Sequence, residues 1–510
     1  MGIGVAFPWL GQKWPAFTLV RMRRILFFIC ALLSSAIAED VDVQVDIPGV
    51  RSGGKFRASN ITRDENKVVQ AAFDGTLEDL IPLRNGGFLI AGTDSARRPF
   101  VARLSRDART LEQRLELPPE FLDAVCIAEG PDESIAVTGR DHNEGIRVGL
   151  ISPGLEKLQW SRTVTGDRPA SVAVAPDGSL VVCPEQKPFV SRIAADGSGL
   201  IPFGQNETFR TDGANADIYK AWWEDCGFAK AGHSSPRYHA GGCAGVVALP
   251  DGEFVLFTTN FLKHPGGLPD FDPMLLRFNS QGKIIWCTNL LDGLPAESDH
   301  KQPHMVLDPG TGDLLLTAIQ HGHFHHNLIA SPGAFLTPHE WLTGDIMIGW
   351  IARVDPATGR PKAATFYFPE LSGQLVGGKK RANSLFPAKP ALDAEGNFYV
   401  TGKSAWKLPT TLHAFQTEPL GGSGFLSVFN PDLTRLLHSS LITAKGFTMA
   451  GKAVAIASGG PVVLGSYETD KPAEADFVSS NADATNFLLE KPAAPKGGFF
   501  GIYPSGNWFE

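Results

Sequence analysis

Cysteine, long apolar runs and short catalytic motifs are all scarce in this sequence. The 510 residues include 6 Cys, at spacings that match no zinc or haem motif. Asp and Glu number 54 against 46 Lys and Arg, so the net charge is −8 and no basic field indicates nucleic acid as a partner. The chain lacks a Gly-x-Ser-x-Gly elbow, a His-Glu-x-x-His pair, a P-loop and an EF-hand loop. These absences exclude the enzyme and metal-binding classes that depend on such motifs.

The first 38 residues have the layout of a secretory signal. A basic stretch at 21–24 (RMRR) precedes an apolar run at 25–36 that is too short to span a bilayer. Ala36-Ile37-Ala38 then fits the small-x-small cleavage pattern. We therefore predict a signal peptide over 1–38, with Met22 as an alternative start; a buried N-terminal helix is the competing interpretation. The mature chain is expected to be secreted or periplasmic, with no membrane span.

Removal of the signal takes Cys30 away and leaves five cysteines. An odd number in an exported protein leaves at least one cysteine unpaired within the chain. Cys226 and Cys243 flank one long loop, and we expect these two to form a disulfide.

The rest of the chain is rich in turn residues, with 55 Gly and 37 Pro, and it repeats one unit. Each unit is an apolar run, a tight turn and a second run, then a variable connection, a third run, a second turn and a fourth run. Asp-Gly and Asn-Gly between apolar runs are strong hairpin signals because type I′ turns need positive φ. The first turn occurs at Asn85-Gly86, Pro131-Asp132, Asp177-Gly178, Asp251-Gly252, Gly312-Asp313, Glu395-Gly396 and Gly459-Gly460.

Seven such units without a helical period predict an all-β fold, a seven-bladed β-propeller of four-stranded antiparallel blades, as a single domain over residues 75–510. Two β-sandwich domains are the competing interpretation. Residues 39–74 are polar and weakly patterned, and they form an N-terminal extension or a closing strand. The strand that completes the seventh blade comes either from this segment or from Asn507-Trp508-Phe509 at the C-terminus.

One unit, at 393–442, carries a family resemblance. Its GN at 396–397, YVTG at 399–402, AFQ at 414–416, GG at 421–422, FL at 425–426, NP at 430–431 and SS at 439–440 resemble the SBBP-type β-propeller repeat of exported bacterial proteins. A poorer match begins at 331 (SPGAF) and continues at 351 (IARVDP). The resemblance covers about two units. It implies a scaffold and no catalytic residues, because the motif residues are turn and packing positions.

Strand parity separates two faces of the predicted ring. The first-to-second and third-to-fourth turns share one face and are tight, whereas second-to-third connections and inter-blade segments share the other face. The long insertions all belong to the second group and to the second half of the ring, and long loops are usually functional or disordered. They lie between blades at 201–242, 290–303 and 370–388, and within blades at 260–272, 321–347, 403–423 and 467–486.

Histidine is concentrated in the same region, since ten of the 13 His fall between 233 and 339. His300 and His304 are expected just before the inner strand of blade five. His321, His323 and His325 follow its second strand and share one side if that strand extends, because residues two apart point the same way. Three interpretations remain open for this stretch: a solvated loop, polar contacts that hold a long loop, or a site for proton transfer or for a divalent metal such as zinc or copper.

The insertion before blade four contains side chains suited to a ligand. Trp222 and Trp223 offer flat apolar surface for a sugar ring or a partner protein. Arg237, Tyr238 and His239 lie near the expected mouth of the central channel, where they fit an anionic or sugar ligand. Packing of the two tryptophans onto the ring explains the same pattern equally well.

Two functions remain open on the sequence alone. The first is an exported propeller that binds a protein or glycan ligand through the insertion-rich face of blades four to seven, with the tryptophan pair and His300 as contacts. The second is a hydrolase or lyase acting on a polysaccharide, with the 237–239 group and His304 as catalytic residues, metal-assisted or not. Neither interpretation involves nucleic acid.

Overall fold

The computed structural model describes residues 68–185, 190–201, 243–263, 269–291, 298–322, 328–420, 422–470, 472, 476–477, 485–489, 492–504 and 508. Within them no helix is long and apolar enough to cross a membrane. The regular structure of this part is nearly all β-strand, with two short 3-10 helices, η2 (Pro153–Leu155) and η3 (Pro338–Glu340).

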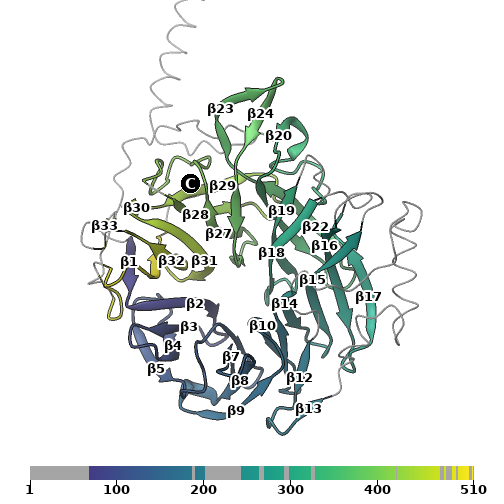
Figure 1. The fold of residues 1–510 in the computed structure, drawn as a ribbon, viewed down its shortest axis with the longest axis vertical. Coiled ribbons are helices and arrows are strands. Elements are labelled where there is room, and N and C mark those ends of the chain that lie inside the picture. The colour runs from purple at the N-terminus through teal and green to yellow at the C-terminus, as the bar shows by residue number, and fades with distance from the viewer. Residues whose placement is uncertain are drawn as a thin grey trace, which may run out of the picture.

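Most of the strands belong to seven antiparallel sheets arranged as a ring (Figure 1). Blades one to three, from the inner strand outward, consist of β2 (Gly75–Pro82), β3 (Phe88–Asp94), β4 (Pro99–Leu104) and β5 (Leu111–Glu116); β6 (Cys126–Glu129), β7 (Ile135–Arg140), β8 (Ile146–Ile151) and β9 (Leu158–Val164); and β10 (Pro169–Val174), β11 (Leu180–Pro184), β12 (Ser191–Ile193) and β13 (Leu200–Ile201). Blades four and five consist of β14 (Cys243–Ala248), β15 (Phe254–Lys263), β16 (Pro269–Phe278) and β17 (Ile284–Asn289); and β18 (Ser298–Leu307), β19 (Leu314–Gly322), β21 (Met347–Val354) and β22 (Pro361–Tyr367).

Blade six has a divided inner strand, β25 (Leu385–Pro387) and β26 (Ala391–Leu392), followed by β27 (Phe398–Ser404), β28 (Ser423–Phe429) and β29 (Leu436–Ile442). Blade seven consists of β31 (Thr448–Ala457), β32 (Gly460–Glu468), β34 (Lys496–Ile502) and β1 (Val69–Phe73). This topology confirms the predicted seven-bladed β-propeller with four-stranded antiparallel blades. The alternative of two β-sandwich domains is wrong.

The ring is closed by the N-terminal segment. β1 pairs antiparallel with β34, from Val69 opposite Ile502 to Phe73 opposite Gly498, and so supplies the outermost strand of blade seven. The chain then enters blade one at Gly75, whose φ of 137° suits only glycine. A blade built from both ends of the chain joins the termini of the ring by backbone hydrogen bonds.

Apolar strands fill the space between blades. Every residue of β28 is buried, because the middle strands of a blade are covered on both faces by neighbouring blades. Tyr367, Phe335 and Phe429 pack edge to face in this region, with ring centroids 5.0–6.3 Å apart. The Tyr367 hydroxyl is also within 2.7 Å of Ser427 Oγ, which satisfies a polar atom that would otherwise be buried without a partner.

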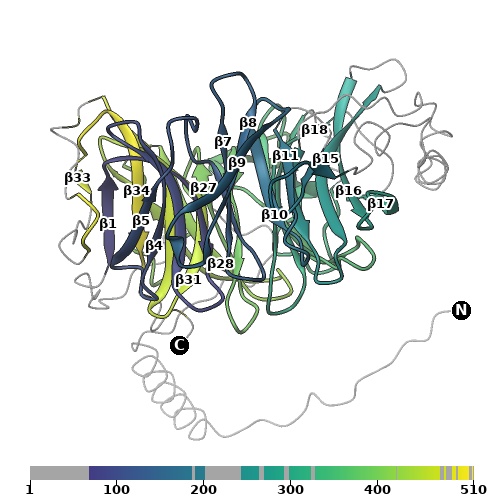
Figure 2. The same ribbon diagram turned by 90° about the horizontal axis from the view of Figure 1, so that it is seen from below.

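The tight turns lie where the sequence predicts them. Gly178, Gly252 and Gly396 have φ of 78°, 83° and 82°, and each donates its backbone N–H to the carbonyl three residues earlier. Asp177 and Asp393 add a carboxylate that accepts backbone N–H groups two residues later in the turn. Figure 2 shows the ring from the side.

The structure corrects several insertion boundaries. Most of 260–272 is strand, because β15 and β16 pair from Phe254 opposite Phe278 as far as Lys263 opposite Pro269. His300 and His304 lie within β18 and not before it, since β18 pairs with β19 as far out as Ser298 opposite Gly322. The segment 370–388 is also not a plain loop: it forms β23 (Glu370–Val376), β24 (Lys379–Ala382) and β25.

Candidate functional site

The turn face, which carries the tight turns, is occupied by a repeated arginine contact between blades. In blades three, four and five, the next-to-last residue of the third strand is an arginine. Its guanidinium binds an acidic side chain in or just after the first turn of its own blade and a backbone carbonyl in the second turn of the next blade. The contacts are Arg192 with Asp177 and the Ser280 carbonyl, Arg277 with Asp251 and the Pro356 carbonyl, and Arg353 with Asp313 and the Pro431 carbonyl.

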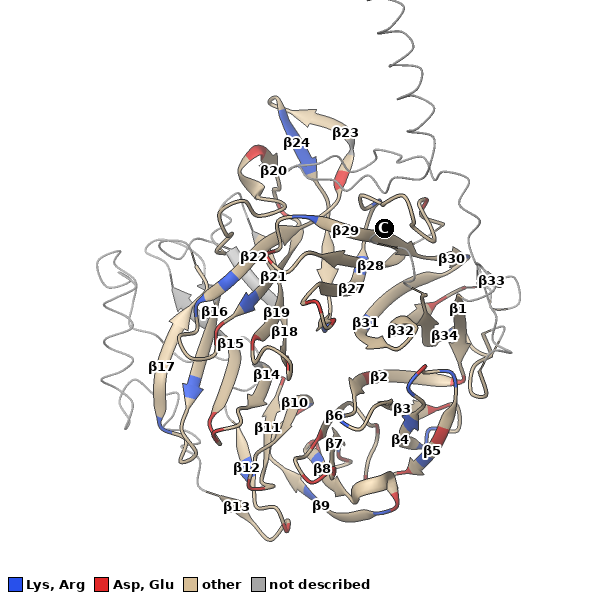
Figure 3. Ribbon diagram, turned by 180° about the vertical axis from the view of Figure 1, so that it is seen from behind, with Lys and Arg blue, Asp and Glu red and all other residues tan. Residues whose placement is uncertain are grey.

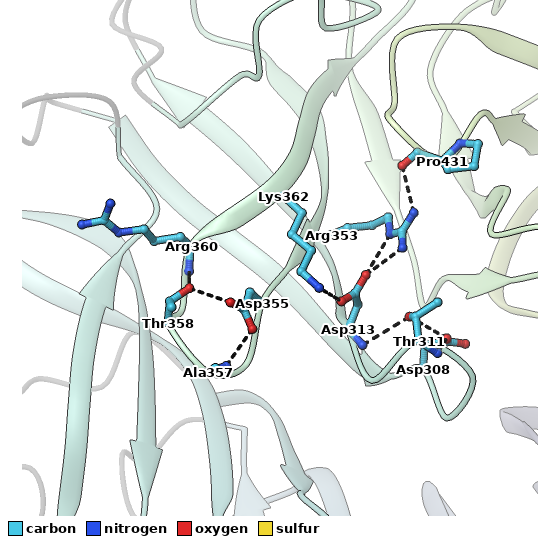
Figure 4. Close-up of polar contacts among 10 residues, drawn as sticks. All are labelled: Asp308, Thr311, Asp313, Arg353, Asp355, Ala357, Thr358, Arg360, Lys362 and Pro431. Atoms are coloured by element: carbon cyan, nitrogen blue, oxygen red, sulfur yellow. Dashed lines mark hydrogen bonds and ion pairs between the residues drawn. The ribbon is translucent and has the colours of Figure 1, made fainter.

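The contact at blade five is the most buried of the three (Figure 4). Asp313 Oδ2 lies 2.7 Å from Arg353 Nη2, and Asp313 Oδ1 lies 2.5 Å from Lys362 Nζ. Only 2% of the Asp313 side chain and 14% of the Arg353 side chain are exposed. Arg353 Nη1 then reaches the Pro431 carbonyl of blade six at 3.1 Å. These polar groups form contacts between blades, which assigns them a structural role.

The insertion face, formed by second-to-third connections and inter-blade segments, exposes apolar side chains. Eight large apolar side chains are exposed in the part of the chain that the structure describes. Two of them, Leu200 and Ile285, are on the outer strands β13 and β17. The other six belong to insertion-face connections: Leu122, Leu375, Val376, Trp406, Leu420 and Leu489. A contiguous exposed apolar patch marks an interaction site, whereas single exposed apolar residues are common, so the residues that share one connection are the relevant ones.

Two of these residues are on the connection between β27 and β28, which is firmly anchored. Thr411 N and Gln416 N donate to the carbonyl of Ser439 and to Ser440 Oγ, both on β29. On the same connection, Trp406 is 37% exposed and Leu420 is 50% exposed. The connection therefore holds an aromatic and an aliphatic side chain toward solvent on an ordered support.

A small extra sheet lies outside the seven blades. β20 (Trp341–Leu342) pairs with β24, and β24 pairs with β23 (Figure 1). The insertion within blade five and the segment that leaves this blade thus form one three-stranded sheet. Trp341 is 5% exposed and packs edge to face on Phe368, with ring centroids 5.2 Å apart. Lys380 Nζ lies 5.0 Å from the Trp341 ring centroid. Figure 3 shows the basic strand β24 at the edge of the molecule.

The central channel contains a second group of polar residues. Asp79 on β2 and Lys389, between β25 and β26, form an ion pair of 2.7 Å. Asp79 also accepts the backbone N–H of Ile127, on the inner strand of blade two, at 3.0 Å. Blade one is thereby joined to blades two and six through one carboxylate, and both charges of the pair are compensated.

His304, one of the predicted catalytic residues, lies on the inner strand of blade five and belongs to this channel group. Burial lowers the pKa of His304 to about 4, nearby Lys389 lowers it further and Asp79 opposes the shift. The imidazole is therefore neutral at physiological pH. Burial, with a contribution from Asp79, raises the pKa of the Cys126 thiol to about 12, so that thiol is protonated and unreactive.

The His-rich stretch is only partly described. His321 Nε2 lies 2.7 Å from Asp345 Oδ1, a contact that ties the end of β19 to the segment before β21. This arrangement agrees with polar contacts that hold a long connection. His304 is paired with Thr317 on the neighbouring strand, and His321 lies four residues further along that strand. The two histidines are therefore separated by about 13 Å along the strand, at roughly 3.3 Å per residue.

Other predicted site residues cannot be placed. Trp222, Trp223, Arg237, Tyr238, His239, His323, His325 and Cys226 lie outside the described residues, and nothing is described of the side chains of His300 and Cys243. The predicted disulfide and the His321–His323–His325 metal site therefore stay predictions. Among the described residues no group of three or more His, Cys, Asp or Glu side chains is arranged to hold a metal ion.

Sequence reasoning missed Trp406, Asp79 and Lys389. The 403–423 connection is predicted as an insertion, but no pattern separates a tryptophan that points to solvent from one that packs onto the ring. Asp79 and Lys389 are 310 residues apart in sequence and meet only because the ring closes. The pairing of β2 with β3 shifts register between Leu77 and Asp79. A β-bulge of this kind redirects the side chains next to it, including that of Asp79.

Neither a family model nor a curated protein matches this chain. The chain is a β-propeller. Among solved structures it is similar to U3-55K, with 9% identity, coverage of 86% of this chain and 98% of that chain, and a TM-score of 0.41. The RRP9 WD40 repeats match with 11% identity, coverage of 78% of this chain and 89% of that chain, and a TM-score of 0.40. Streptogramin B lyase matches with 10% identity, coverage of 86% of this chain and 97% of that chain, and a TM-score of 0.40. These likenesses concern the fold and say nothing of ligand or activity.

Proposed function

We propose that this protein is an exported β-propeller that binds a protein or glycan ligand through the insertion face of blades four to seven. One observation supports this proposal above all others: Trp406 and Leu420 are exposed on a connection whose base is fixed to blade six. An ordered aromatic side chain loses little conformational entropy on binding and contributes a large apolar contact. The turn face offers no comparable surface among the described residues, because its large apolar groups are buried and its arginines join the blades.

The surface chemistry favours a protein over a glycan ligand. Trp406 suits either, since a flat indole stacks on sugar rings and is also common at the centre of protein interfaces. Leu420 suits a protein, because an aliphatic side chain buries apolar area without offering a sugar a hydrogen-bond partner. The Lys407–Glu418 ion pair spans this connection and adds a polar rim to the apolar surface.

Export and family belong to the same proposal. The basic, apolar and small-x-small segments at 21–38 support a signal peptide, and the turn motifs at 393–442 support a divergent SBBP-type repeat. Both rest on sequence alone.

The proposal is tested with a Trp406→Ala/Leu420→Ser variant. Ligands are sought on a glycan array and by affinity purification from extracytoplasmic extracts with quantitative mass spectrometry. We expect one ligand to be lost from the double variant, with a weakening of about 30-fold or more, as for an interface tryptophan worth at least ~2 kcal/mol. Leu200→Ser on the outer strand β13 is the matched control and should bind normally. Equal ligand recovery by the parent and the double variant would reject the proposed surface.

A further inference from the structure

The hairpin of β23 and β24 is built to project. It extends beyond the rim of the ring next to blades five and six (Figure 1). Its two-residue turn is Gly377-Gly378, with φ of 58° and 77°, the left-handed conformation that glycine favours in type I′ hairpins. A Cβ atom added at either glycine would find no neighbouring atom within 4 Å. Both glycines of the turn therefore have open space beside them.

The side chains at this tip are aliphatic and basic. Leu375 is 64% exposed, the most of any large apolar side chain in the described part, and Val376 is 47% exposed. The next strand begins with three consecutive cations, Lys379, Lys380 and Arg381. A chain with a net charge of −8 thus places its most exposed aliphatic residue beside a cluster of positive charge.

The strand register decides which side chains act together. Val376 is directly opposite Lys379, and Arg381 shares their face because residues two apart point the same way. Leu375 is opposite Lys380, whose ammonium lies over the Trp341 ring. Both faces of the hairpin therefore combine an aliphatic residue near the tip with a cation directly opposite it, and Arg381 lies further from the tip.

One acidic group lies at the far end of this sheet, and another lies beside its first cation. Glu370 is opposite Ala382 at the far end of the hairpin, and burial raises the pKa of its carboxyl. Glu340 precedes β20, which pairs parallel with β24 from Trp341 opposite Lys380, so Glu340 is level with Lys379. Asp345 is held by His321. Lys379, Lys380 and Arg381 therefore leave this sheet with an excess of positive charge beside the aliphatic tip, even with Glu340 and Glu370 present.

We propose that this hairpin docks on an anionic lipid bilayer, with Leu375 and Val376 inserted among the headgroups and upper acyl chains and Lys379 and Arg381 bound to lipid phosphates. Aliphatic groups side by side with long cationic side chains fit the boundary between acyl chains and anionic headgroups, because such cations reach the phosphates while their stems stay in apolar surroundings. Two aliphatic side chains and a few cations give reversible, peripheral binding. This docking is separate from the ligand site at Trp406 and Leu420, and either can fail without the other.

Vesicle flotation tests the proposal directly. The mature chain is mixed with phosphatidylcholine vesicles that contain or lack phosphatidylglycerol, at low and at high salt. We expect flotation only with anionic vesicles and its loss at 0.5 M salt, because attraction between exposed charges is screened there. Lys379→Ser/Arg381→Ser should weaken binding roughly 30-fold, at about fivefold per cation, and Leu375→Ser/Val376→Ser at least tenfold.

Matched controls exist elsewhere on the ring. Leu200→Ser/Ile285→Ser removes two apolar groups, 46% and 45% exposed, from outer strands, and Lys157→Ser/Lys283→Ser removes two exposed cations from the turn face. Both controls should float like the parent. Absence of flotation with the parent at low salt, equal flotation of the hairpin variants and the parent, or loss of an acidic protein partner without any effect on vesicles would each overturn the proposal. All substitutions are at exposed positions, and an unchanged Tm verifies that the variants are folded.

Discussion

The buried carboxylate of Asp313 allows a quantitative test of the arginine contacts between blades. Asp313→Asn keeps the shape of the side chain and removes its charge, which leaves Arg353 without its counter-ion at 14% exposure. Breaking a buried ion pair by neutralising one partner costs about 3–5 kcal/mol. The half-exposed Lys362 adds no more than about 1 kcal/mol. We therefore expect the free energy of unfolding to fall by about 3 kcal/mol.

The matched comparison is Asp251→Asn in blade four. Asp251 makes the same kind of contact, at 2.7 Å from Arg277 Nη2, but its side chain is 51% exposed. Glu253 also pairs with Arg277, so the guanidinium keeps an acidic partner in this variant. An exposed pair of this kind is worth about 1 kcal/mol or less. The two substitutions are chemically identical and differ in burial and in the partners that remain.

The assay is thermal and urea unfolding of both variants, followed by a double-mutant cycle with Arg353→Met. For a cooperative unit of this length, at roughly 2 cal/mol/K per residue, each kcal/mol corresponds to about 1 °C in Tm. Asp313→Asn should lower Tm by about 3 °C and Asp251→Asn by less than about 1 °C. Arg353→Met should recover part of the loss caused by Asp313→Asn, because it removes the orphaned charge. Equal losses at Asp313 and Asp251 would refute the role given to burial.

Three other positions carry testable consequences. Burial, assisted by His413, lowers the pKa of His438 to about 3 from an unfolded value near 6.5. The unfolded state therefore takes up a proton first, and stability should fall as pH drops from about 6.5 towards 3. Urea midpoints across that range should fall less in His438→Phe, and the same fall in this variant as in the parent would contradict the cause. Trp508, 4% exposed and stacked on His438 at 3.8 Å, should cost about 3 kcal/mol on replacement by Ala, measured by urea unfolding; a loss below ~1 kcal/mol would show that the C-terminal contact is dispensable. Lys389→Met leaves Asp79 without its cation and should lower the free energy of unfolding by about 2 kcal/mol, after allowance for the 25% exposure of the Lys389 side chain. Asp79→Asn/Lys389→Met should recover stability. No recovery would mean that packing, not charge, dominates at this contact.

The sequence predicted the fold well because propeller blades are specified locally. Turn chemistry such as Asp177-Gly178 and Asp251-Gly252 is set by neighbouring residues and needs no knowledge of distant parts of the chain. The arginine of the third strand is visible in the apolar runs that end in Arg192-Ile193 or Arg277-Phe278. Its partner in the next blade is a backbone carbonyl, which has no side-chain signature.

The candidate site was less predictable for physical reasons. Asp79 and Lys389 come together only through ring closure, and a single sequence contains no signal for a contact of that range. The hairpin at Gly377-Gly378 lies in a segment predicted as an insertion and was not recognised as strand, because β23 contains few β-branched residues. His304 lies on an inner strand beside Asp79 and Lys389, where burial lowers the pKa of its imidazole, and its catalytic role stays a prediction.

Site-specific photo-crosslinking tests the central claim, that the insertion face carries the ligand contact. A photoreactive amino acid is placed at Trp406 or Leu420 on the insertion face, and at Asp196, an exposed second-turn residue on the turn face. We predict that irradiation in the protein's native setting yields one common crosslinked ligand from Trp406 and Leu420 and none from Asp196. Crosslinking of that ligand from Asp196 alone would show that the turn face binds it and would contradict the account.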